Sequence, residues 1–190
     1  KDPTRLNLGS GVRPWLREIG LAGKTSHTKR VPAFVFTAPE TQVAQFLGAY
    51  FACDGHINVR GNARRDAAVE FYSVSRDLLA DLQHLFLRLG VRSTLRAKRV
   101  AHNTFVDGPH TSWRLTITSQ DDVAKLTARM PIPGVKAAVL KDWTLSRTDF
   151  ERLLLPDPIV SVEPAGLNPS RCLTVEHDHT FTADDLVVHN

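Results

Sequence analysis

The segment from Thr41 to Cys53 is apolar on nearly every side of the helix that its composition predicts. A helix of this kind is buried on all sides or pressed against another helix. Three small residues, Gly48, Ala49 and Ala52, recur at a spacing of three to four. Small side chains at this spacing would let the backbone of a partner helix come close.

Asp54 and Gly55 directly follow this apolar segment, and the next residues, 56–60, have the composition of a strand. A carboxylate held at the end of a buried helix, just before a strand, is well placed to hold a metal ion. The alternative is an ordinary Asp-Gly turn that ends a helix.

The patterns around this helix predict an α+β fold. Strands are expected at 56–60, 68–74, 91–97 and 112–118, the last two alternating as antiparallel strands with one polar face do. Helices are expected at 13–20, at 76–89 with Ser75 as the N-cap, from 119 or 120 to about 130, and within 135–155. The central order is helix, strand, strand, helix, strand, strand, helix.

A proline-rich linker at 156–158 predicts a boundary between residues 1–155 and 156–190. Beyond it, short strands are expected at 159–162, 171–176 and 186–188. So few residues in short strands cannot bury a core of their own. The second segment is therefore expected to complete a sheet supplied from elsewhere.

Charge separates the same two segments. Residues 1–155 contain 23 Lys or Arg against 14 Asp or Glu, whereas residues 156–190 contain 1 against 6. A basic body of this size suits a polyanion such as nucleic acid, with a solvated basic surface as the alternative. No apolar run is long enough to span a membrane and Lys1 to Pro3 do not open a signal peptide, so we expect a soluble cytoplasmic protein without a membrane partner.

The dipeptide His189-Asn190 follows an apolar, strand-like run. The side-chain amide nitrogen of an asparagine can attack its own main-chain carbonyl, closing a succinimide and releasing whatever follows. An adjacent histidine can polarise that carbonyl or protonate the leaving amine. Taken alone, His-Asn is also consistent with a chance dipeptide.

Together, these features resemble the C-terminal portion of an intein that carries a LAGLIDADG-type homing endonuclease domain. The resemblance is carried by the segments 46–55, 29–32 and 78–91, which are similar to endonuclease blocks, and by 172–181 and 187–190, which are similar to the two C-terminal splicing blocks. It implies one αββαββα half of an endonuclease followed by strands that complete an all-β Hint splicing domain. The implied activities are single-turnover protein splicing and cleavage of double-stranded DNA.

For splicing, the resemblance implies that Asn190 cyclises, that His189 assists, and that His179 is a second proton-transfer group, with no cofactor. Cys172 stands where most inteins have Asp. Its thiol is the first nucleophile, a group that modulates the coupling of steps, or an inert small residue.

For the endonuclease, the resemblance implies that Asp54 binds Mg²⁺ together with an Asp from a first helix of the same kind, and that Lys98 or His110 is the accompanying basic residue. Basic side chains on or near the strands would contact DNA, namely Arg60, Arg92, Arg96, Lys98 and Arg114. The implied partners are an N-terminal intein segment, which supplies the splicing half and the first helix, the flanking host exteins and double-stranded DNA. The alternative is a DNA-binding or DNA-cleaving nuclease whose tail is only structural.

Overall fold

The computed structural model describes residues 11–60, 66–100, 110–145, 159–169, 173–176 and 180–189. The chain divides into two units, Lys1–Phe150 and Glu151–Asn190. The first unit contains the helices α1 (Val12–Glu18), α2 (Ala33–Thr37), α3 (Glu40–Asp54), α4 (Arg76–Arg88), α5 (Gln120–Arg129) and α6 (Val135–Leu145), with the strands β1 (His56–Arg60), β2 (Asp66–Ser73), β3 (Thr94–Val100) and β4 (His110–Ile117). The second unit contains β5 (Thr180–Ala183) and β6 (Leu186–His189).

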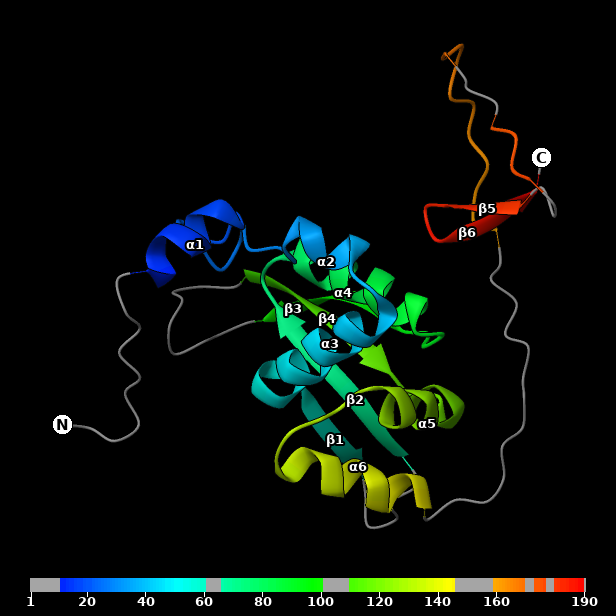
Figure 1. Ribbon diagram of the computed structural model, residues 1–190. Helices are drawn as coiled ribbons and strands as arrows, with labels where there is room; N and C mark the ends of the chain where they lie inside the picture. The colour runs from blue at the N-terminus through cyan, green and yellow to red at the C-terminus, as the bar shows by residue number, and fades with distance from the viewer. Residues whose placement is uncertain are drawn as a thin grey trace. The chain divides into compact units, whose positions relative to one another are not determined.

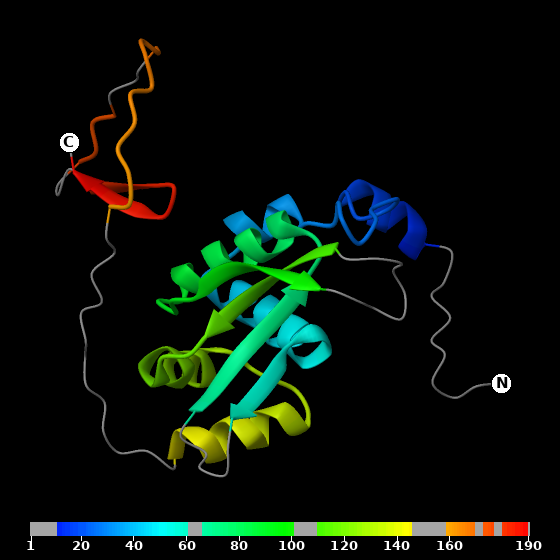
Figure 2. The same ribbon diagram turned by 180° about the vertical axis from the view of Figure 1, so that it is seen from behind.

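The first unit is built on one antiparallel sheet with the strand order β1-β2-β4-β3. From α3 to α5 the order of elements is αββαββα, as the sequence predicts. Helices α3 and α4 lie on one face of the sheet (Figure 1). Figure 2 looks onto the other face, which no described helix crosses in that view.

The core lies between the sheet and these two helices. The ring of Phe71 on β2 contacts those of Phe51 on α3 and Phe86 on α4, with centroids 5.8 and 5.4 Å apart. Leu47 and Phe51 of α3 are fully buried, which confirms that this helix packs into the molecule. Because side chains alternate across a strand, Glu70 and Tyr72, which flank Phe71, lie on the opposite face of the sheet.

Helix α4 begins where the sequence predicts, with the Ser75 hydroxyl accepting a hydrogen bond from the Leu78 amide at 3.2 Å. The same hydroxyl donates to the Lys29 carbonyl at 2.8 Å. Buried Asp81 on α4 accepts two hydrogen bonds from Arg30, at 2.6 and 3.0 Å, and one from the Val31 amide at 3.1 Å. These contacts fix the segment 29–32 to α4 and so set where α2 and α3 begin.

Two elements of the first unit differ from the sequence prediction. The third strand begins at Thr94, not at residue 91, because Gly90 adopts a positive φ of 70° and the Arg92 amide donates to Asp122 on α5 instead of to a strand. Helix α2 has only five residues, and its sequence, AFVFT, has no helical periodicity long enough to predict it. The rest of the helix expected within 135–155, beyond Leu145, lies outside the described residues.

In the second unit, β5 and β6 form an antiparallel hairpin in which Thr180 pairs with His189 and Ala183 with Leu186. Asp184 and Asp185 form its turn with φ of 46° and 65°, values typical of a two-residue hairpin loop. The strand expected at 186–188 is therefore confirmed, whereas residues 159–162, and the described residues 173–176 of the strand expected at 171–176, form no strand in this chain. A strand needs hydrogen-bonded neighbours, and Ile159, Val160 and Val162 are 83 to 94% exposed, with no pairing among the described residues.

Candidate functional site

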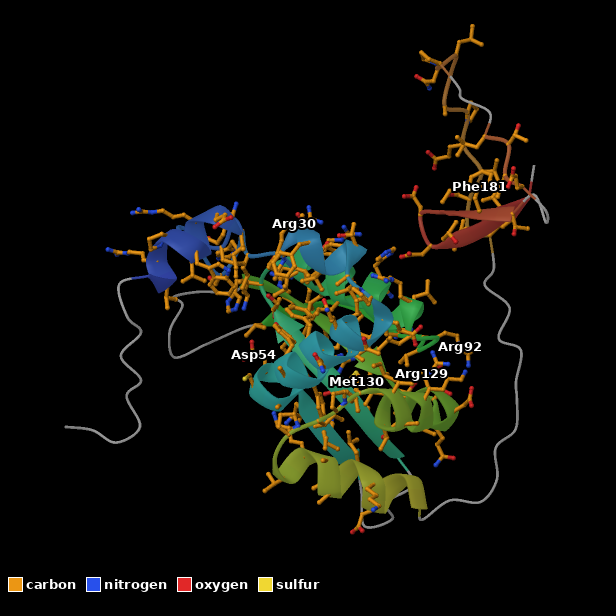
Figure 3. All side chains as sticks on the ribbon, in the orientation of Figure 1. Arg30, Asp54, Arg92, Arg129, Met130 and Phe181 are labelled. Atoms are coloured by element: carbon orange, nitrogen blue, oxygen red, sulfur yellow. The ribbon has the colours of Figure 1, made fainter. Side chains whose placement is uncertain are left out.

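Asp54 is the last residue of α3, and its side chain is exposed (Figure 3). Tyr50 lies one turn earlier and forms a side-chain hydrogen bond with Asp54. Burial of the phenol, the nearby Asp54 charge and this hydrogen bond raise the pKa of Tyr50 well above its usual value. Tyr50 therefore stays protonated and can orient the Asp54 carboxylate.

The two long sides of α3 have different surroundings. On one side Gly48 is buried against the backbone of Pro131, and a Cβ at residue 48 would lie 2.3 Å from the Pro131 carbonyl oxygen. On another side Gln45, Ala49 and Cys53 are exposed at a spacing of one helical turn. Gly48 thus contacts backbone inside the molecule. Gln45, Ala49 and Cys53 form an open stripe that ends beside Asp54.

Lys136 on α6 closes the C-terminal end of α3. Its ammonium donates to the carbonyl oxygens of Phe51, Ala52 and Gly55 at 3.0, 2.7 and 2.6 Å, and lies 5.5 Å from the centroid of the Phe51 ring. A lysine has three N–H donors, and these contacts use all of them. No N–H donor of Lys136 therefore remains for a phosphate. Its role is to cap α3 and to hold the turn that carries Asp54.

We expect Lys136→Met to lower the free energy of unfolding by about 2 kcal/mol, since carbonyl groups at the negative end of α3 lose a charged donor. The control is Lys125→Met on α5, whose ammonium forms a surface ion pair with Asp121 at 2.6 Å. Such pairs contribute about 0.3–0.5 kcal/mol. Urea unfolding of both variants measures the difference, and equal losses would contradict the capping role.

The sheet face opposite the helices contains several of the predicted DNA-binding residues. Arg96 on β3 and Arg114 on β4 are directly paired across the ladder, and Tyr72 on β2 pairs with Arg114 from the other side. Lys98 belongs to the same face, with its ammonium 4.9 Å from the centroid of the Tyr72 ring. Three predicted cations therefore gather on one surface.

A carboxylate that the sequence analysis did not single out lies among these cations. Glu70 is fully buried, although it is on the face of β2 that none of the described helices covers in Figure 2. It accepts hydrogen bonds from the side-chain amide nitrogen of Asn58 at 3.2 Å and from the Tyr72 hydroxyl at 2.6 Å, and it forms an ion pair with Arg114 at 3.6 Å. Burial and the hydrogen bond to Glu70 raise the pKa of Tyr72. Only the strand alternation of residues 68–74 could have placed Glu70 on this face.

The remaining predicted residues lie elsewhere. Arg92 precedes β3 and forms an ion pair with Asp122 of α5 at 3.2 Å, beside α5 in Figure 3. Arg60 ends β1, and nothing is described of its side chain. His110 begins β4 and lines a surface pocket with Ala97, Arg99 and Thr111. Of the predicted splicing residues, Cys172, His179 and Asn190 lie outside the described residues, as does the side chain of His189.

Within the described parts of the chain, no three His, Cys, Asp or Glu side chains gather as a metal site. Mg²⁺ is commonly held by one or two carboxylates and several waters, so exposed Asp54 fits as one ligand and needs no cage around it. None of the described helices is long and apolar enough to cross a membrane.

The fold agrees with comparisons to known proteins. Residues 41–131 match the model of the LAGLIDADG-like domain. The chain is 24% identical to a replicative DNA helicase DnaB of Rhodothermus marinus over 94% of its length, 36% identical to an elongation factor 2 of Methanopyrus kandleri over 88%, and 41% identical to a DNA polymerase II large subunit of Thermococcus kodakarensis over 46%. It spans only 26%, 17% and 5% of these relatives, respectively. The α+β unit with its single antiparallel sheet fits a LAGLIDADG-like domain.

Proposed function

We propose that this chain is the C-terminal part of an intein, in which half of a LAGLIDADG-type homing endonuclease precedes the C-terminal splicing segment. The observation that carries the proposal is the set of relatives. A helicase, an elongation factor and a polymerase subunit have different activities, yet each matches this chain over a minor part of its own length. A segment shared by otherwise unlike proteins is what an inserted, mobile element produces.

The splicing chemistry is assigned to the end of the second unit. The side-chain nitrogen of Asn190 attacks the main-chain carbonyl carbon of the same residue and forms the succinimide. The peptide bond to the following residue breaks, and the departing amine takes a proton from His189. Cys172 either forms a branched thioester as the first nucleophile or modulates the coupling of steps.

The β5–β6 hairpin lies between two of the proposed splicing residues in the sequence. Thr180 pairs with His189 across the hairpin. His179 precedes Thr180 and Asn190 follows His189 in the sequence, so each lies one residue beyond the described pairs. In the proposed chemistry His179 is the second proton-transfer group.

The endonuclease half is proposed to bind double-stranded DNA through Arg96, Lys98 and Arg114 on the open face of the sheet. The open stripe of Gln45, Ala49 and Cys53 on α3 would receive the first helix of the N-terminal intein segment. Asp54 would then hold Mg²⁺ with the Asp of that helix, and the metal would stabilise the charge that develops on the phosphate.

The experiment is ligation of flanking segments. The N-terminal segment and the chain are produced with short flanking reporters, the one after Asn190 beginning with Cys, and products are identified by mass spectrometry. We expect the joined reporters from the unaltered protein, and N-terminal cleavage without C-terminal cleavage from Asn190→Ala. Processing that is unchanged in Asn190→Ala would contradict splicing and favour a nuclease whose tail is only structural.

A further inference from the structure

Glu70 is unusual because it places a fully buried negative charge on the face of the sheet where cations gather. Arg96 and Arg114 lie directly opposite each other on neighbouring strands, and like charges in that position repel. Glu70 offsets this repulsion, but it also weakens the attraction of the face for phosphates. A surface that bound DNA only through phosphate contacts would gain nothing from this carboxylate.

Glu70 contacts side chains from three strands directly and is linked to the fourth strand through one of them. It directly engages Asn58 of β1, Tyr72 of β2 and Arg114 of β4. The ring of Tyr72 in turn lies beneath the ammonium of Lys98 on β3. A single carboxylate therefore connects one polar side chain from each strand across the open face.

These contacts also decide which atoms remain available to a ligand. A carboxylate only accepts hydrogen bonds, so the Asn58 amide must turn its nitrogen toward Glu70, and its oxygen is left as an acceptor. Arg114 uses one terminal nitrogen, Nη1, for the ion pair at 3.6 Å, and its side chain remains 30% exposed. Arginine and asparagine are the residues that read guanine and adenine edges through paired hydrogen bonds, which require a fixed orientation.

We propose that Glu70 is a positioning residue for the reading of DNA sequence, acting by holding Arg114 and Asn58 in fixed orientations on the sheet face. This inference rests on the proposed binding of double-stranded DNA. In addition, Glu70 lowers the affinity of the sheet face for DNA of random sequence and raises its discrimination between sequences. Replacing Glu70 should therefore change the two properties in opposite directions.

The test compares Glu70→Gln with Glu163→Gln, which removes the same charge from an exposed residue of the second unit. Each is prepared with the N-terminal segment, and a preferred duplex is selected from a random pool with the unaltered protein. For Glu70→Gln we expect discrimination between the selected and random duplexes to fall about tenfold or more, while affinity for the random duplex stays equal or rises. Glu163→Gln should match the unaltered protein.

Tyr72→Phe gives a second variant that keeps the Glu70 charge and loses only the hydroxyl donor. We expect a smaller fall in discrimination at unchanged affinity for the random duplex. As a readout without DNA, ultraviolet titration should show a lower pKa for Tyr72 in Glu70→Gln, because its hydrogen-bond acceptor loses its charge.

Discrimination that is unchanged in Glu70→Gln would overturn the inference. Equal losses of affinity for both duplexes, together with a lower melting temperature, would also overturn it, because they would make Glu70 merely structural. If the unaltered protein binds duplexes without preferring any sequence, this inference fails, and if it binds no duplex at all, the proposed DNA-binding function itself fails.

Discussion

Asp54→Asn is expected to lower the rate of Mg²⁺-dependent cleavage of double-stranded DNA by about 1,000-fold or more when the chain is combined with its N-terminal segment. The amide of asparagine carries no charge and is a poorer ligand for Mg²⁺ than a carboxylate. A metal ion contributes several kcal/mol to stabilising the charge of the transition state, and each 1.4 kcal/mol changes a rate tenfold. Plasmid nicking in single-turnover conditions measures the loss.

The matched control is Asp77→Asn, which makes the same change at an exposed residue of α4. It should cleave at a rate within a few-fold of the unaltered protein. The melting temperature of Asp54→Asn should stay close to that of the unaltered protein, because the Asp54 side chain is exposed. Nicking that persists in Asp54→Asn at the unaltered rate would remove Asp54 from the metal site.

The second large effect is expected from Gly48→Ala, which should destabilise the first unit. In a helix interior, alanine is favoured over glycine by about 1 kcal/mol. A Cβ at residue 48 would, however, lie 2.3 Å from the carbonyl oxygen and 3.0 Å from the carbonyl carbon of Pro131. These are backbone atoms that cannot rotate away, and overpacking of this kind costs about 1–3 kcal/mol or more. The steric cost therefore exceeds the gain in helix propensity.

Ala49→Gly provides the control on the next residue of the same helix, where the side chain is exposed. It should destabilise by about 1 kcal/mol through helix propensity alone. Gly48→Val should be worse than Gly48→Ala, because its branched side chain adds atoms at the same contact. Urea unfolding orders the variants, and a Gly48→Ala protein more stable than the unaltered one would contradict the close approach of Pro131 to α3.

Much of the first unit follows from local patterns in the sequence. The order from α3 to α5 could be predicted because each element has its own period and its own boundary residue, such as Ser75 at the start of α4. The start of β3 could not, because the contact of the Arg92 amide with Asp122 joins residues thirty positions apart. The strand expected at 159–162 shows another limit of prediction from sequence. An apolar composition favours a strand, but it does not supply the neighbouring strand with which it would pair.

The candidate site divides in the same way. Asp54 is predictable because an Asp-Gly pair directly ends an apolar helix, and the cations of the open face follow from strand alternation. Lys136 is not predictable, because it reaches carbonyl groups that are 81 to 85 residues away in the sequence. The role of Glu70 depends on three partners from three strands, and strand pairing cannot be assigned from one sequence.

The most direct test of the splicing proposal is the intact mass of the chain released from a precursor extended beyond Asn190 and supplied with its N-terminal segment. Cyclisation of Asn190 predicts a released chain that is lighter, by one water molecule, than the same chain ending in a free asparagine carboxylate. The succinimide should then hydrolyse slowly to the heavier form. A released chain that has the heavier mass from the earliest time, or the same release from Asn190→Ala, would contradict protein splicing at this residue.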